Sequence, residues 1–163
     1  MSPLQIHLLF NHFPVILSLI CIPVLLWAYR SSSKEVWQAA FAFSLLASIT
    51  VAPAFFTGEG AEETLEDRPG ISSHQIHEHE ELAEKALWPM ILLGVLSLWG
   101  LYSRSKKMIP FALFAAITSG VLLGLTAHEG GAIRRPELKA ESIDAAQAPP
   151  TLIPEDEETV DAE

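Results

Sequence analysis

The segment Leu4–Tyr29 reads LQIHLLFNHFPVILSLICIPVLLWAY and decides the fold class of this 163-residue chain. It contains no Asp, Glu, Lys or Arg, and it exceeds the ~20 residues that a helix needs to cross ~30 Å of hydrocarbon. Three more uncharged apolar runs follow at Val36–Thr57, Ala86–Tyr102 and Met108–Ala127. A bilayer offers no water to the backbone, so the spanning form is helical. The sequence therefore predicts an all-α integral membrane four-helix bundle.

Charged residues between the apolar runs predict the orientation. The connections at 30–35 and 103–107 carry net charges of +1 and +3, whereas residues 58–85 and 128–163 hold nine and ten of the 20 acidic residues. Cytoplasmic loops are enriched in Lys and Arg. We therefore expect both termini and the long connection on the outer, periplasmic side of a bacterial inner membrane.

The domain organisation follows from the same pattern. We expect one transmembrane domain over residues 1–135, with residues 58–85 as an outer loop and helix extension that includes a short acidic helix at Ala61–Asp67. Residues 136–163 are rich in Ala, Pro and acids, which is typical of a disordered tail. No nucleic-acid signature is present, and no soluble domain of a size suited to ordinary catalysis remains, so the sequence favours a non-enzymatic role.

Six histidines all fall on the predicted outer side of the bilayer: His7, His12, His74, His77, His79 and His128. Ionisable groups within a membrane span are costly and mark functional sites. His12 is the deepest, although it lies about 140° around an ideal helix from His7. His79 shares a helix face with apolar residues and is expected to point inward. His128 continues a stripe that begins at Gly120 and Gly124.

These inward histidines predict a b-type haem, because a neutral imidazole nitrogen binds haem iron. The favoured ligands are His12 with His79 or His128, and His7 is the substitute. Gly120 and Gly124 would receive the flat ring, and Arg134 or Arg135 would pair with its propionates. The chain would then be an electron-transfer protein, and its acidic outer face would attract a basic soluble cytochrome.

Two other interpretations remain open from the sequence. One is a membrane protein that binds zinc, copper or iron. Its ligands would come from His7, His12, His79, His128, Glu59, Glu62 and Glu63. The other is an accessory subunit of a respiratory or photosynthetic membrane complex, in which the histidines only hydrogen-bond between helices.

Four motifs resemble those of a widespread bacterial family of four-helix membrane proteins of unknown function, over about residues 4–135. His7 and His12-Phe13-Pro14 resemble its His-x4-His-Phe-Pro opening, and Thr57-Gly58-Glu59 with Ala61-Glu62-Glu63 resembles its Thr-Gly-x-x-Ala-Glu-Glu turn. His79-Glu80 with Ala83 is similar to its His-Glu-x-x-Ala motif, and His128-x-Gly130-Gly131 is similar to its closing segment. Leu8 replaces the family's usual proline. The resemblance implies the fold, the grouping of these residues and a redox or haem role.

Overall fold

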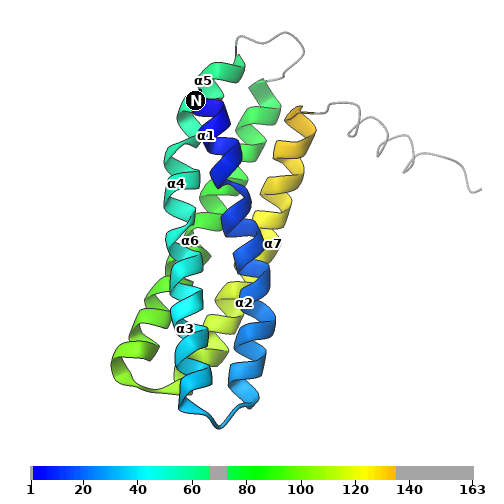
Figure 1. Cartoon of the computed structure of the whole chain (residues 1–163). Helices are drawn as coiled ribbons and strands as arrows, with labels where there is room; N and C mark the ends of the chain where they lie inside the picture. The colour runs from blue at the N-terminus through cyan, green and yellow to red at the C-terminus, as the bar shows by residue number, and fades with distance from the viewer. Residues whose placement is uncertain (1, 67–72, 135–163) are drawn as a thin grey trace, which may run out of the picture.

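The computed structural model describes residues 2–66 and 73–134, and over these residues the chain is helical with no strand (Figure 1). Four helical segments are long and apolar enough to cross a membrane: Pro3–Arg30, Lys34–Glu63, Ser73–Ser103 and Lys106–Ile133. The all-α fold and the four apolar spans predicted from the sequence are confirmed. The predicted tail at 136–163 lies outside the described residues.

Two of these segments are interrupted, and the other two are nearly continuous. The first segment comprises α1 (Pro3–Phe10) and α2 (His12–Arg30). The second comprises α3 (Lys34–Ile49), α4 (Val51–Phe56) and α5 (Gly58–Glu66). The third is α6 (Ser73–Ser103), and the fourth is the 3-10 turn η1 (Lys106–Met108) followed by α7 (Ile109–Arg134). The predicted short acidic helix corresponds to α5.

Prolines explain two of the interruptions. Pro14 and Pro53 each lie three residues beyond a break, at Asn11 and at Thr50. A proline has no N–H to donate to the carbonyl four residues earlier, and its ring clashes with that carbonyl. The carbonyls that lose their hydrogen-bond donors are those of Phe10 and Ile49, the last residues of α1 and α3. Thr57 forms the third break, where its hydroxyl donates to the Pro53 carbonyl at 2.7 Å.

The four long helices pack side by side. α2 contacts α3 and α7, and α6 contacts the same two helices from the other side (Figure 1). The interior holds Leu25, Phe41 and Met90 at full burial, whereas the outer surface carries large apolar groups such as Trp27 and Phe114. A soluble monomer rarely exposes so much apolar surface. This distribution is the one expected when lipid surrounds the helices.

Small residues set the separation of α3 and α6. A Cβ placed on Gly100 would lie 2.5 Å from the ring of Phe41, and one placed on Gly94 would lie 2.5 Å from the Ser48 hydroxyl. Both distances are well inside ordinary contact. Glycine at these two positions therefore lets the neighbouring helix approach closely.

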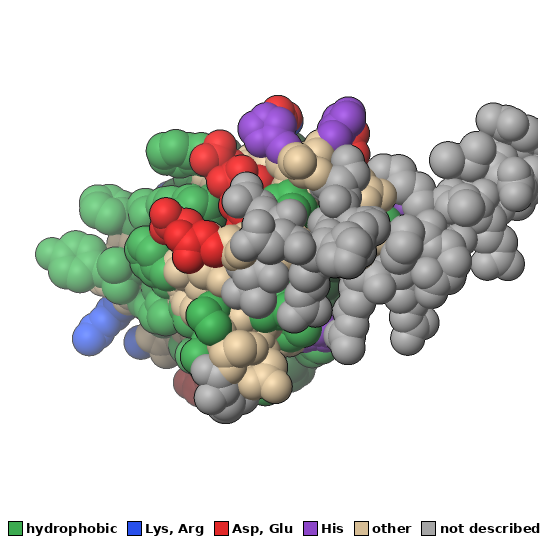
Figure 2. All heavy atoms as spheres, turned by 90° about the horizontal axis from the view of Figure 1, so that it is seen from above, with side chains coloured by type: hydrophobic (Ala, Val, Ile, Leu, Met, Phe, Trp, Pro, Cys, Tyr) green, Lys and Arg blue, Asp and Glu red, His purple; other side chains and the backbone are tan. Residues whose placement is uncertain are grey.

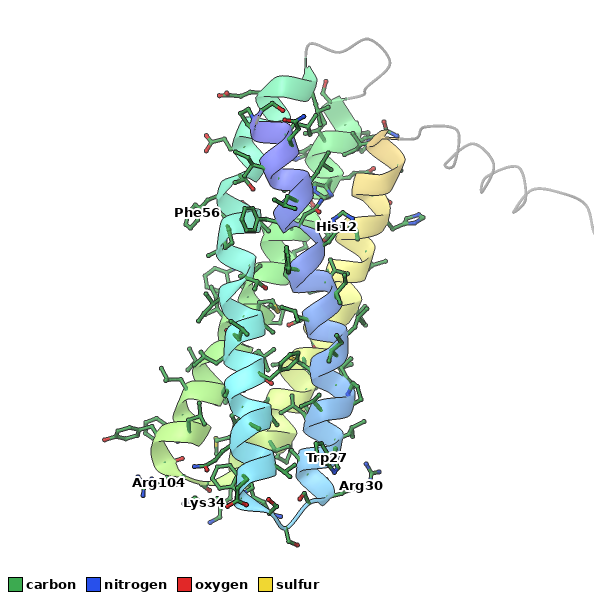
Figure 3. All side chains as sticks on the ribbon, viewed as in Figure 1. His12, Trp27, Arg30, Lys34, Phe56 and Arg104 are labelled. Carbon is green, nitrogen blue, oxygen red and sulfur yellow. The ribbon has the colours of Figure 1, made fainter. Side chains whose placement is uncertain are left out.

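The two ends of the molecule differ in charge and in construction. Figure 2 looks onto the end formed by α1, α5 and the start of α6, where acidic and histidine side chains gather. Figure 3 places Arg30, Lys34 and Arg104 at the opposite end. There Arg104, at φ 50°, directly follows the last residue of α6, and the Ser105 N–H donates to the Gly100 carbonyl at 3.2 Å. This is a Schellman cap with arginine where glycine is the usual residue.

Candidate functional site

A cavity of about 770 Å³ lies at the acidic end, where α1, α4 and α5 meet α6 and α7. Its volume is within the ~300–1,000 Å³ range of ligand and cofactor pockets. Most of its wall is apolar and includes Leu4, Leu8 and Ile76. The polar part of the wall contains two histidines, His7 from α1 and His79 from α6.

His7 is held by the irregular turn between α4 and α5. Its Nδ1 lies 3.0 Å from the Ala54 carbonyl oxygen and 3.2 Å from the Thr57 hydroxyl oxygen. A carbonyl oxygen only accepts hydrogen bonds, so the proton of a neutral His7 ring is on Nδ1. The Thr57 hydroxyl donates its own proton to Pro53 and can accept from His7. The lone pair of His7 is therefore on Nε2.

His79 is held in the same way by the fourth long helix. Its Nδ1 lies 2.9 Å from the Thr126 carbonyl oxygen on α7. The same reasoning places the proton on Nδ1 and the lone pair on Nε2. Gly130, one turn further along α7, makes room for the ring: a Cβ there would lie 3.0 Å from His79 Cε1.

The two imidazole rings are neighbours across the cavity. Their centroids are 6.5 Å apart and their planes are nearly perpendicular, at 86°. Within the described residues, neither Nε2 atom has a hydrogen-bond partner. Metal–imidazole bonds are about 2 Å long, so rings on opposite sides of one metal ion have centroids about 6 Å apart. Metal-binding histidines also donate their other N–H to a carbonyl, as both of these do. His7 and His79 could therefore hold one metal between them through their Nε2 atoms.

His12 and His128, the other two histidines predicted to bind the haem, are not part of this pair. His12 is exposed at the start of α2 (Figure 3), where its Nδ1 contacts the side-chain oxygen of Asn11. His128 is exposed on α7. The expectation that these two residues point inward is wrong. A spacing of five residues puts His7 and His12 on different helix faces, and packing against α4 and α5 buries the face of His7.

His74 and His77 are exposed on α6. The His77 ring lies 3.4 Å from Glu81 and 3.7 Å from Glu80, and His74 lies 3.9 Å from Glu78. All these contacts are between residues three or four apart on α6. They are local surface pairs of one helix, and of their members only Glu80 lines the cavity.

The glycine stripe of α7 consists of Gly120, which packs against a neighbouring helix, and Gly124, which is exposed. A Cβ on Gly120 would meet Leu19 and Ile22 of α2 at 3.3 and 3.6 Å, whereas Gly124 has nothing within 4 Å. Gly120 therefore packs against α2, and the expectation that this stripe receives a flat cofactor stays a prediction. The Arg134 side chain and Arg135 lie outside the described part of the chain.

Several carboxylates line the same cavity as the two histidines. Glu59, Glu62, Glu80 and Glu84 line it, and Glu63 is exposed on α5. Among the described residues, no group of three or more His, Cys, Asp or Glu side chains is close enough to hold a metal ion. The predicted metal site of several histidines and glutamates is thus not assembled. No Lys or Arg is among the described residues that line the cavity.

Sequence reasoning missed the groups that orient the two histidines. The carbonyls of Ala54 and Thr126, the Thr57 hydroxyl and Gly130 all act on the rings. One signal was available, because Thr57 follows Pro53 by four residues, the spacing at which a threonine hydroxyl reaches a carbonyl of its own helix. Backbone carbonyls carry no sequence signal of their own.

Comparisons with known proteins leave this site without a precedent. A scan against protein-family models, a search of curated proteins and a search of solved structures each gave no match for the chain. The assignment of the site therefore depends on its geometry, and the resemblance to the four-helix family stays a prediction.

Proposed function

We propose that this chain is a membrane-embedded electron-transfer protein that holds one b-type haem between His7 and His79. The observation that carries the proposal is the pair of imidazole rings 6.5 Å apart, each with Nδ1 bonded to a backbone carbonyl. Both rings thereby keep Nε2 for a metal, and their carbonyl partners lie on separate helices. Haem, when bound, would supply one-electron chemistry.

The number of ligands favours haem over a bare ion held by protein alone. His7 and His79 would be enough to hold a haem iron, and the described residues bring together no third histidine, cysteine or carboxylate ligand. A zinc site, by comparison, takes three or four protein ligands. The cavity of about 770 Å³ and its apolar wall also suit a large flat ring better than a single ion. Leu4, Leu8 and Ile76 would exclude water from that ring.

The acidic rim, formed by the four glutamates that line the cavity (Glu59, Glu62, Glu80 and Glu84), determines which charges a bound haem would need nearby. Haem propionates are anionic, and four glutamates line the cavity. The propionates therefore need a cation, and we assign that role to Arg134 or Arg135. Arg134 directly follows Ile133, which lines the cavity.

The placement in the cell is part of the same proposal. With four spans and basic residues at one end, the positive-inside rule puts Arg30, Lys34 and Arg104 in the cytoplasm. The histidine site and both termini then lie at the periplasmic side of a bacterial inner membrane. The acidic end in Figure 2 would attract a basic soluble electron carrier, such as a cytochrome, or a larger complex.

The absorption spectrum of the purified chain tests the proposal. We expect a Soret band and a sharp α band on reduction, as for six-coordinate haem, with about one haem per chain. His7→Ala or His79→Ala should abolish the six-coordinate spectrum. His12→Ala and His128→Ala are matched controls, since both side chains are exposed, and they should keep it. A spectrum unchanged by His7→Ala and His79→Ala would contradict the assignment.

A single metal cation is the second candidate, and the acidic rim favours it. Four carboxylates line the same cavity as the two imidazoles and attract a cation, and soft or borderline ions such as copper accept imidazole ligands. Elemental analysis of the same preparations separates the two candidates. Stoichiometric copper, zinc or non-haem iron without a Soret band, lost in both His7→Ala and His79→Ala, would support the cation site.

A further inference from the structure

The buried hydroxyls of the four long helices are of two kinds. Those of Ser18, Ser48 and Ser119 donate to carbonyls of their own helices at 2.7–2.9 Å. Ser44 and Ser97 are fully buried, and neither hydroxyl has a hydrogen-bond partner within the described residues. A helical serine reaches its own carbonyls easily. These two hydroxyls therefore point away from their own backbones.

Ser44 and Ser97 lie at one level of the α3–α6 interface. Gly94 meets Ser48, and Gly100 meets Phe41, so residue numbers fall on α6 as they rise on α3. Ser44 lies between Phe41 and Ser48, and this register places it opposite Ser97. The register thus brings the two hydroxyls without partners to the same level of the α3–α6 contact.

A third polar group joins them from α2. Cys21 is fully buried, and its thiol lies beside the Ser44 hydroxyl. Ser44 is ten residues from the start of α3, which is about 15 Å along the helix and near the middle of a ~30 Å core. Cys21 and Ser44 are therefore neighbours far from either membrane surface, and the helix register adds Ser97 at the same level.

We propose that this cluster binds one internal water molecule, which links α2, α3 and α6 at mid-membrane. A buried water typically makes about three hydrogen bonds to polar groups that otherwise lack partners. Ser44, Ser97 and Cys21 supply that number. Lipid offers no replacement partner, so the two hydroxyls need one inside the protein. This site is separate from the cavity that contains His7 and His79.

An experimental structure of the full chain at about 2 Å resolution is the direct test. We expect a density peak within hydrogen-bond distance of Ser44 Oγ and Ser97 Oγ, close to Cys21 Sγ. A direct bond between the two hydroxyls, or hydroxyls turned back to their own helix carbonyls, would overturn the proposal.

Thermal unfolding in detergent gives an independent test. We expect Ser44→Ala and Ser97→Ala each to lower the Tm by about 2–4 °C. The double variant should fall little further than either single variant, because one water serves both. Ser119→Ala is the matched control: its hydroxyl already bonds to Ala115 at 2.7 Å within its own helix, so its effect should be smaller. Additive losses in the double variant would count against the shared water.

Discussion

Replacing Gly130 by alanine tests the position of the His79 ring. The new Cβ would lie 3.0 Å from Cε1 and 3.2 Å from Nδ1 of His79, whereas apolar atoms pack best at about 3.5–4.0 Å. The ring cannot retreat without lengthening its 2.9 Å hydrogen bond to Thr126. Overpacking of this kind costs about 1–3 kcal/mol. The gain in helix propensity from glycine to alanine is about 1 kcal/mol.

Gly124 and Gly131, also on α7, are the matched controls. Neither has an atom within 4 Å of a new Cβ, so alanine there should give only the gain in propensity. The free energy of unfolding of Gly130→Ala should thus be about 2 kcal/mol below that of Gly124→Ala. This corresponds to a Tm difference of about 4–8 °C for a chain of this size.

The assay is thermal unfolding of cofactor-free protein in detergent, so that loss of a bound group does not contribute. Absorbance of loaded samples then reports whether the displaced His79 ring still binds. If Gly130→Ala is as stable as Gly124→Ala and Gly131→Ala, the His79 ring does not pack over Gly130. The reasoning about the ligand pair would then be refuted.

Three further changes follow from contacts described above. Arg104→Gly should raise the free energy of unfolding by about 1 kcal/mol in thermal unfolding, because glycine adopts positive φ without strain; an unchanged Tm would contradict the cap. Thr57→Val should alter the spectrum of a cofactor bound at His7, and Thr57→Ser should restore it, because only serine retains the hydroxyl. Gly100→Ala should lower the free energy of unfolding by at least about 1–3 kcal/mol, since Phe41 is fully buried against it; a neutral result would mean that α3 and α6 are further apart.

The four-helix fold was predictable because each spanning helix corresponds to one continuous apolar run in the sequence. Each apolar run is long enough to span a bilayer, and the runs end at charged residues such as Arg30 and Lys34. The acidic helix after Thr57 could also be predicted, since glycine and glutamate residues mark both the break and the polar face. These features require no knowledge of which helices are neighbours.

The site was only half predictable, since it depends on neighbours. His7 and His79 were both candidates, but depth in the membrane favoured His12 over His7. The structure turns His7 toward α4 and α5 and leaves His12 exposed. Helix geometry alone shows that His7 and His12 cannot lie on the same helix face. It does not show which face packs, because Pro14 and the break at Asn11 redirect α1.

The breaks at Asn11 and Thr50 divide the molecule into two mechanical parts. Above them, α1, α4 and α5 contact one another and enclose much of the cavity, whereas α2 and α3 below pack as continuous helices. A cofactor could therefore be loaded by local opening of the upper segments while the lower half stays folded. If the chain holds the proposed haem, its insertion into the membrane and the acquisition of that haem would be separable events. Amide hydrogen exchange of the cofactor-free chain should then be faster in α1 and α5 than in α2 and α3.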